Sequence, residues 1–149
     1  MAKELLKRSE VETEFTWDLT DLCADIPAWE AAMEEMQEIA GQLAETKGRL
    51  GESAQTLFSF LSRMEEMEKK AAPAISYAQR LSDQDVGDTV HQAMLQRLHS
   101  IMADLSDKLS FMDPEILALD AQTLEQYFAQ EPALEAYRKY IEEIQRLKP

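Results

Sequence analysis

Side chains that can carry out chemistry are scarce in this 149-residue sequence, which holds one cysteine, Cys23, and two histidines, His91 and His99. A single cysteine excludes a disulfide within the chain and favours a reducing, cytoplasmic setting. Cys23 would act as a nucleophile only beside a base, and we interpret it as a small buried thiol. The H-E-x-x-H zinc pattern, Gly-rich phosphate loops and the nucleophile elbow are absent. The sequence therefore predicts no catalytic site, metal site or cofactor in this chain.

The two histidines are too far apart to share a metal ion. They stand eight residues apart on one predicted helix, which separates them by about 12 Å along its axis, whereas Zn–N bonds are near 2 Å. Asp88 and His91 lie one turn apart, but a di-iron bundle needs two Glu-x-x-His pairs and two further glutamates. We therefore expect a solvated histidine beside an acid.

Helix breakers and long apolar runs are also few. The sequence has four glycines and five prolines, which leaves room for long helices. No run approaches the roughly 20 apolar residues of a membrane-spanning helix, and the first eight residues do not form a secretory signal. We expect neither a membrane segment nor a cleaved leader.

Basic residues are outnumbered by acidic ones, 15 against 29, which gives a formal net charge of −14. This charge argues against a nucleic-acid partner, which needs clustered Lys and Arg, and against an anionic membrane surface. The acids are expected on solvated helix faces, where they keep the protein soluble. The alternative is that they repel anions or attract cationic peptides.

The residues that are present predict helices. The first begins after Asp25, a capping residue followed by Pro27, and ends at Gly48 and Gly51. Its apolar residues recur at helical spacing: Trp29, Met33, Met36, Ala40, Leu43 and Leu50. The second begins after Ser53, and Pro73 inside it predicts a kink or a break. Its stripe is Leu57, Leu61, Met64, Met67, Ala71, Ile75 and Ala78.

A third long helix is expected over residues 85–111, after a turn and cap at 82–85. Its stripe is Val90, Met94, Leu98, Ile101, Leu105, Leu109 and Met112. Shorter helical pieces follow from Asp113, near Asp120 and from Glu131, with Leu124, Tyr127, Phe128, Leu134, Tyr137, Ile141, Ile144 and Leu147 inward. Short links between long helices favour antiparallel neighbours. The fold class predicted for residues 26–149 is all-α, an antiparallel long-helix hairpin or bundle with shorter C-terminal helices.

Residues 1–25 are expected to form an N-terminal arm. Residues 13–17 alternate polar and apolar side chains, which predicts a short strand-like stretch, and residues 17–22 suit one helical turn. Trp17, Leu19 and Leu22 are predicted to anchor the arm and are the candidate domain-docking anchors. Tyrosines 77, 127, 137 and 140 can either line a peptide groove or pack at the edge of the core, and we favour the second.

Several short stretches in order along the chain resemble one known family. They are KRSEV at 7–11, FTWDLTDL at 15–22, Trp29, KGRLGES at 47–53, residues 77–78, Asp83, LSF at 109–111 with residues 114–115, YRKY at 137–140 and IQRLKP at 144–149. In this order they resemble the N-terminal region of oligoendopeptidase F, in the thimet-oligopeptidase-like group of zinc metallopeptidases.

The resemblance implies a specific role. Members of that family are largely helical enzymes whose N-terminal helices form part of the wall of a channel that admits oligopeptides and excludes folded proteins. Their zinc is held by an H-E-x-x-H helix and a downstream glutamate, and none of these residues maps to a position here. The resemblance thus implies a non-catalytic domain whose partner is the missing catalytic domain of the same protein, with oligopeptides contacted indirectly. The sequence then looks like a truncated product, an isolated domain or a split reading frame.

Two other functions stay open from the sequence. The chain can be a self-contained helical interaction module, and its apolar stripes allow self-association. More distantly, it can be a bundle enzyme with a metal-carboxylate site.

Overall fold

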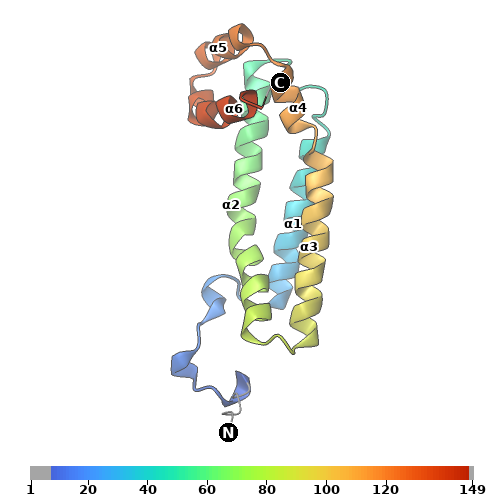
Figure 1. Ribbon diagram of the computed structural model, residues 1–149, viewed down its shortest axis with the longest axis vertical. Helices are drawn as coiled ribbons and strands as arrows, with labels where there is room; N and C mark the ends of the chain where they lie inside the picture. The colour runs from blue at the N-terminus through green and yellow to red at the C-terminus, as the bar shows by residue number, and fades with distance from the viewer. Residues whose placement is uncertain (1–7, 148–149) are drawn as a thin grey trace.

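The computed structural model describes residues 8–147 and shows a bundle of three long helices capped at one end by shorter ones (Figure 1). Residues 1–7 of the expected arm and 148–149 of the expected helical domain lie outside the described residues. The helices are α1 (Ile26–Ala44), α2 (Ala54–Gln84), α3 (Thr89–Leu109), α4 (Met112–Ala118), α5 (Ala121–Gln130) and α6 (Arg138–Gln145). The 3-10 turns are η1 (Arg8–Glu10), η2 (Thr13–Phe15), η3 (Leu19–Asp21) and η4 (Pro132–Tyr137). No strand occurs within residues 8–147, and the predicted all-α class is confirmed.

Local capping begins α1 and α2 where the sequence predicts. The Asp25 carboxylate accepts a hydrogen bond from the backbone N–H of Ala28 at 2.8 Å, and the Ser53 hydroxyl accepts one from Thr56 N–H at 3.0 Å. These bonds satisfy N–H groups that a helix leaves free at its first turn. After α1 ends, Gly48 takes a φ of 83°, a conformation that favours glycine.

Helix α2 passes through Pro73 without a break, so a division into two helices is wrong. Proline removes one backbone hydrogen bond, but Ala71 and Ala74 on either side are buried in the core. Packing therefore holds both halves of α2 as one element.

The turn before α3 lies later than predicted. Helix α2 continues through Gln84, and Ser82 is buried, where its hydroxyl accepts a hydrogen bond from Gln92 Nε2 at 2.9 Å. The cap of α3 is Asp88, which accepts from the N–H groups of Val90 and His91. The predicted third long helix is present, but its predicted start at 85 and cap at 82–85 are wrong, because Asp88 can satisfy two free N–H groups at once. Val90, expected inward, is 56% exposed in this first turn.

The C-terminal helices follow the prediction in part. Asp120 caps α5 by accepting from Thr123 N–H at 2.7 Å. The last predicted helix instead starts as the 3-10 turn η4 and becomes α-helical only at Arg138. Leu134, Ile141 and Ile144 are buried as predicted, whereas Leu147 is exposed after the end of α6.

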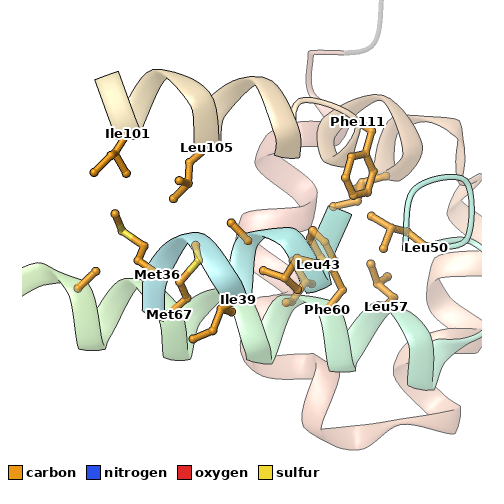
Figure 2. Close-up of a cluster of buried hydrophobic side chains, with 14 of the residues drawn as sticks. Met36, Ile39, Leu43, Leu50, Leu57, Phe60, Met67, Ile101, Leu105 and Phe111 are labelled. Atoms are coloured by element: carbon orange, nitrogen blue, oxygen red, sulfur yellow. The ribbon is translucent and has the colours of Figure 1, made fainter. Parts of the chain in front are cut away.

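The core lies between the three long helices (Figure 2). Met36, Ile39 and Leu43 of α1 meet Leu57, Phe60 and Met67 of α2 and Ile101 and Leu105 of α3. Trp29 and Met33 are completely buried. None of the described helices is both long and apolar enough to cross a bilayer.

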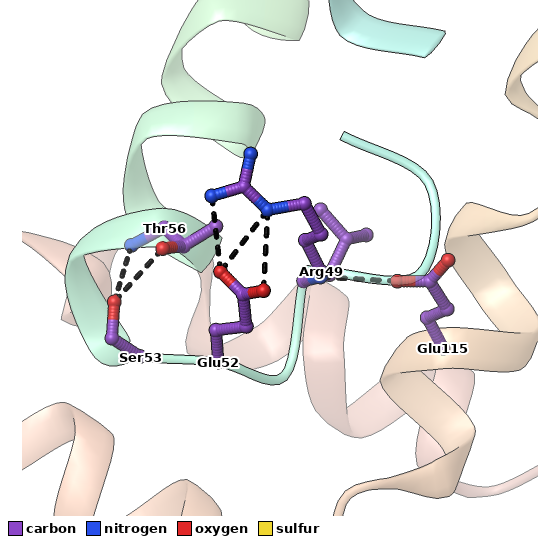
Figure 3. Close-up of polar contacts among 6 residues, drawn as sticks. Arg49, Glu52, Ser53, Thr56 and Glu115 are labelled. Atoms are coloured by element: carbon purple, nitrogen blue, oxygen red, sulfur yellow. Dashed lines mark hydrogen bonds and ion pairs between the residues drawn. The ribbon is translucent and has the colours of Figure 1, made fainter. Parts of the chain in front are cut away.

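The link between α1 and α2 fastens the short helices to the bundle. The Glu115 carboxylate of α4 accepts hydrogen bonds from the backbone N–H groups of Gly48 and Leu50. Figure 3 shows Glu115 facing this link from the neighbouring helix. The Tyr127 hydroxyl of α5 donates to the Gly51 carbonyl at 2.7 Å. Two stretches that carry the family resemblance, 47–53 and 114–115, therefore meet in space.

The arm is built from turns rather than a strand. Residues 13–15 form η2, and the Thr16 hydroxyl donates to the Thr13 carbonyl at 2.7 Å. The predicted strand-like stretch is wrong because short-range hydrogen bonds, not a neighbouring strand, satisfy this backbone. The predicted helical turn is present as η3, capped by Asp18.

The two glycines Gly41 and Gly48 should respond oppositely to alanine. Gly48→Ala is expected to lower the free energy of unfolding by about 1 kcal/mol, because the new side chain must adopt a positive φ. Gly41→Ala, within α1 and with open space around the added methyl, should raise it by about 0.5–1 kcal/mol. Urea unfolding followed by circular dichroism measures both, and changes of the same sign would contradict the assigned conformations.

The cap at Asp88 should make stability depend on pH. Hydrogen bonds from the backbone N–H groups of His91 and Val90 lower the pKa of Asp88. The stability that the ionised carboxylate supplies is complete above its unfolded-state pKa and is lost as pH falls through the folded-state pKa. Asp88→Ala should therefore lower Tm at pH 7, and the difference should shrink below about pH 4.

Asp88→Asn is the control, because it keeps a capping oxygen that does not titrate. Its Tm at pH 7 should exceed that of Asp88→Ala. A Tm difference between the native protein and Asp88→Ala that stays constant from pH 7 into the acid range would refute the role of the ionised cap.

Candidate docking surfaces

The two histidines lie on α3 and are not brought together. His91 Nδ1 is 3.8 Å from an oxygen of Asp88 and has no hydrogen-bond partner within residues 8–147. Asp88 already serves as the α3 cap, and His99 is exposed. Across the part of the chain that the structure describes, no group of three or more His, Cys, Asp or Glu side chains is placed to hold a metal ion. These residues therefore do not fit a zinc ion, which needs three or four converging ligands.

Cys23 lies at the edge of the core. Its thiol is partly buried and donates weakly to the Asp25 carbonyl, at an Sγ–O distance of 3.5 Å. Burial raises the pKa of the nearby Tyr77 hydroxyl, and the charges of Cys23 and Asp25 raise it further. Cys23 is thus a packing residue beside the start of α1.

The neighbouring glutamates of α2 form surface ion pairs. Glu65 pairs with Lys69, and Glu66 pairs with Arg63 and Lys70. Contact with Lys69 and then Tyr137 lowers the pKa of Glu65, and contact with Arg63 and Lys70 lowers that of Glu66. General acid–base catalysis at neutral pH needs a carboxyl pKa that is raised toward 7. These carboxylates are solvated partners of basic residues instead.

The four tyrosines pack against the core, as the favoured interpretation predicts. Tyr77 and Tyr127 are buried, and Tyr137 and Tyr140 are partly buried. The Tyr137 hydroxyl donates to Glu65 at 2.6 Å, and that of Tyr140 contacts the Met112 sulfur at 3.6 Å. The hydroxyls of Tyr137 and Tyr140 therefore link separate elements.

An apolar groove runs between α2 and α3. It is lined chiefly by Met64, Met67, Ile75, Met102, Leu105 and Met112, and its volume is about 570 Å³. We name it the methionine groove. Met64 and Ile75 belong to the predicted core stripe of α2 but are only partly buried, and Met102 is 41% exposed. The groove could not be placed from the residue pattern, although eight methionines in the sequence are a signal of adaptable apolar surface.

The three predicted anchors of the arm divide into two groups. Leu19 is buried in the core and Leu22 packs partly against it, whereas the Trp17 side chain is 77% exposed. Gln84 Nε2 donates to the Trp17 carbonyl at 3.5 Å, which ties this part of the arm to the end of α2. Phe15 is exposed as well. The arm therefore presents two aromatic rings beyond the surface to which its leucines fix it.

Comparison with known proteins points to one family. The family model described as Oligopeptidase F matches residues 115–149. The chain is 29% identical over 148 residues, 99% of its length, to oligopeptidase PepF of Bacillus subtilis, of which it covers 22%. It is 28% identical over 143 residues to the chromosomal oligoendopeptidase F of Lactococcus lactis subsp. cremoris, again covering 22% of that protein.

Solved structures agree. The chain matches oligoendopeptidase F from Enterococcus faecium with a TM-score of 0.72 and 30% identity, over 82% of this chain and 24% of that one. A crystal structure from Chlamydophila abortus matches with a TM-score of 0.83 and 26% identity, over 97% of this chain and 24% of that one. The chain spans less than a quarter of the length of these relatives, and it resembles the N-terminal part of oligoendopeptidase F.

Proposed function

We propose that this chain is the non-catalytic wall domain of an oligoendopeptidase F-like zinc metalloendopeptidase, which restricts the access of peptides to a zinc site on another domain. One observation carries the proposal: nearly all of the chain matches proteins named oligopeptidases or oligoendopeptidases, and it covers only 22% of their length. Peptide hydrolysis belongs to the remaining three quarters, since the residues described here do not fit a zinc ion.

The geometry supports a steric role. Helix α2 has 31 residues and is therefore about 46 Å long. It packs along α1 and α3 over a close-packed core in which Trp29 and Met33 are completely buried. Close-packed interiors resist compression, so the bundle can hold the edge of a channel in place while peptides pass.

The arm supplies a candidate contact with the catalytic domain. Leu19 and Leu22 fix the base of the arm to the bundle, which leaves Trp17 and Phe15 free to pack elsewhere. Large aromatic side chains are frequent anchors of protein interfaces because they bury much apolar area. Trp17 is therefore the docking anchor in this proposal, and a cytoplasmic location belongs to the same proposal.

The isolated chain provides the first test. Purified chain should contain no stoichiometric zinc by elemental analysis and should leave an oligopeptide uncut, as monitored by mass spectrometry. Cleavage that survives repurification and stops with a chelator would overturn the proposal.

A chimera provides the second test, with this chain replacing the segment that it matches in B. subtilis PepF. The chimera should cleave a short peptide and should discriminate against an unfolded protein, as measured by the ratio of the two kcat/KM values. Trp17→Ala should reduce this discrimination, because the domain would dock less firmly, whereas Val86→Ala, at another exposed site, should not. Equal discrimination in the native and Trp17→Ala chimeras would contradict the anchoring role.

The rival function, a self-contained interaction module, predicts a different result. Such a module would pair with itself or another protein through its exposed apolar surface, and its chimera with PepF would have no reason to be active. An inactive chimera together with a tight dimer of the isolated chain would favour the module.

A further inference from the structure

The methionine groove is an apolar concavity of about 570 Å³, and nothing in the function proposed above yet occupies it. We propose that it receives an amphipathic helix that carries a Lys or Arg beside its apolar face, and that this helix belongs to the catalytic part of the longer peptidase. The inference rests on the proposed function and names the partner of this face of the wall domain.

The walls of the groove suit a helix. They are formed by side chains of two adjacent helices, with Met64 and Ile75 on α2 and Met102 and Leu109 on α3. An extended peptide would need hydrogen-bond partners along its whole backbone, and the mainly apolar walls, with Ser106 and Ser110 as their hydroxyl groups, supply few. A helix satisfies its own backbone and can lay an apolar stripe between two others. Methionine side chains are flexible, so they can adapt to the face that docks.

Two acidic residues beside the groove favour a Lys or Arg on the helix that docks there. Glu68 of α2 and Asp113 of α4 also line it, and both are exposed. Neither forms an ion pair with a Lys or Arg within the described residues. Burial is the main cause that raises the pKa of Tyr140, and the charges of Asp113 and Glu68 raise it further. Both carboxylates therefore lie near the same hydroxyl. A cation placed between them would gain from two negative charges at once.

The same charges argue against a second copy of this chain as the occupant. Each copy carries a formal net charge of −14, and two copies joined at this groove would bring the Glu68 and Asp113 carboxylates of both toward one interface. Like charges placed together in this way are repulsive. The relatives, in contrast, hold more than three quarters of their length outside the matched segment, which is ample chain to supply the helix.

Oxidation of methionine by hydrogen peroxide tests the proposal, because it depends on exposure and is read residue by residue in mass spectra. Met102 should oxidise at least about fivefold more slowly in the PepF chimera than in the isolated chain, since the docked helix would cover it. Val86→Met, placed on the exposed turn outside the groove, should oxidise equally in both and is the internal reference. Equal oxidation of Met102 in both proteins would overturn the proposal.

Charge variants test the basic residue. In the chimera, Glu68→Gln with Asp113→Asn should return Met102 oxidation part of the way toward the rate in the isolated chain, whereas Glu34→Gln with Glu38→Gln on α1 should leave it unchanged. Equal effects of the two pairs would overturn the charge assignment. Protection of Met102 that appears only at high concentration of the isolated chain, or only when a basic oligopeptide is added to the chimera, would assign the groove to another occupant and overturn the proposal.

The outcome is separable from that of the proposed function. An active chimera that discriminates against the unfolded protein, but in which Met102 oxidises as fast as in the isolated chain, refutes only the groove assignment. A chimera in which Met102 is protected from oxidation, but which cuts the short peptide and the unfolded protein equally well, refutes only the proposed restriction of access.

Discussion

The apolar stripe of α2 is the constraint on which the rest of the structure depends. Leu57, Phe60 and Leu61 are almost completely buried, and α2 packs against α1, α3, α5 and the turns η3 and η4. Shortening one such side chain to alanine typically costs about 2–5 kcal/mol. Because α1, α3, α5, η3 and η4 all contact α2, the placement of the arm and the methionine groove follows from its packing.

The link from residue 45 to 53 decides where the short helices lie. Glu115 accepts hydrogen bonds from two backbone N–H groups of this link, and Tyr127 donates to a third residue. Gln145 of α6 in turn donates to carbonyls at the end of α4. Backbone groups that would otherwise lack partners are satisfied in this way. The C-terminal helices are therefore held over the start of α2, which leaves the far side of the bundle and the groove exposed.

Features set by neighbouring residues could be predicted from the sequence. Asp25, Ser53 and Asp120 cap helices a few residues away, and the spacing of Trp29, Met33 and Met36 identifies the inner face of α1 without knowledge of its partners. The resemblance to oligoendopeptidase F could be recognised because it rests on short stretches in order along the chain.

Features set by distant residues could not be predicted. The continuity of α2 at Pro73 depends on packing around it, and the contact of Glu115 with Gly48 joins residues far apart in sequence. Trp17 and Val90 occupy apolar positions of local patterns, yet their side chains are exposed because no element covers them. The groove has the same origin: Met102 lies outside the predicted stripe, and only the placement of α3 beside α2 turns it into a lining residue.

In the function proposed above, this domain borders the path of the peptide and takes no part in cutting it. A photo-crosslinking oligopeptide, bound to the chimera and mapped by mass spectrometry, tests this most directly. If the proposed function is correct, labels appear on the bundle of this chain as well as on the catalytic part. Labels confined to the catalytic part, with peptide bound at saturation, would contradict it.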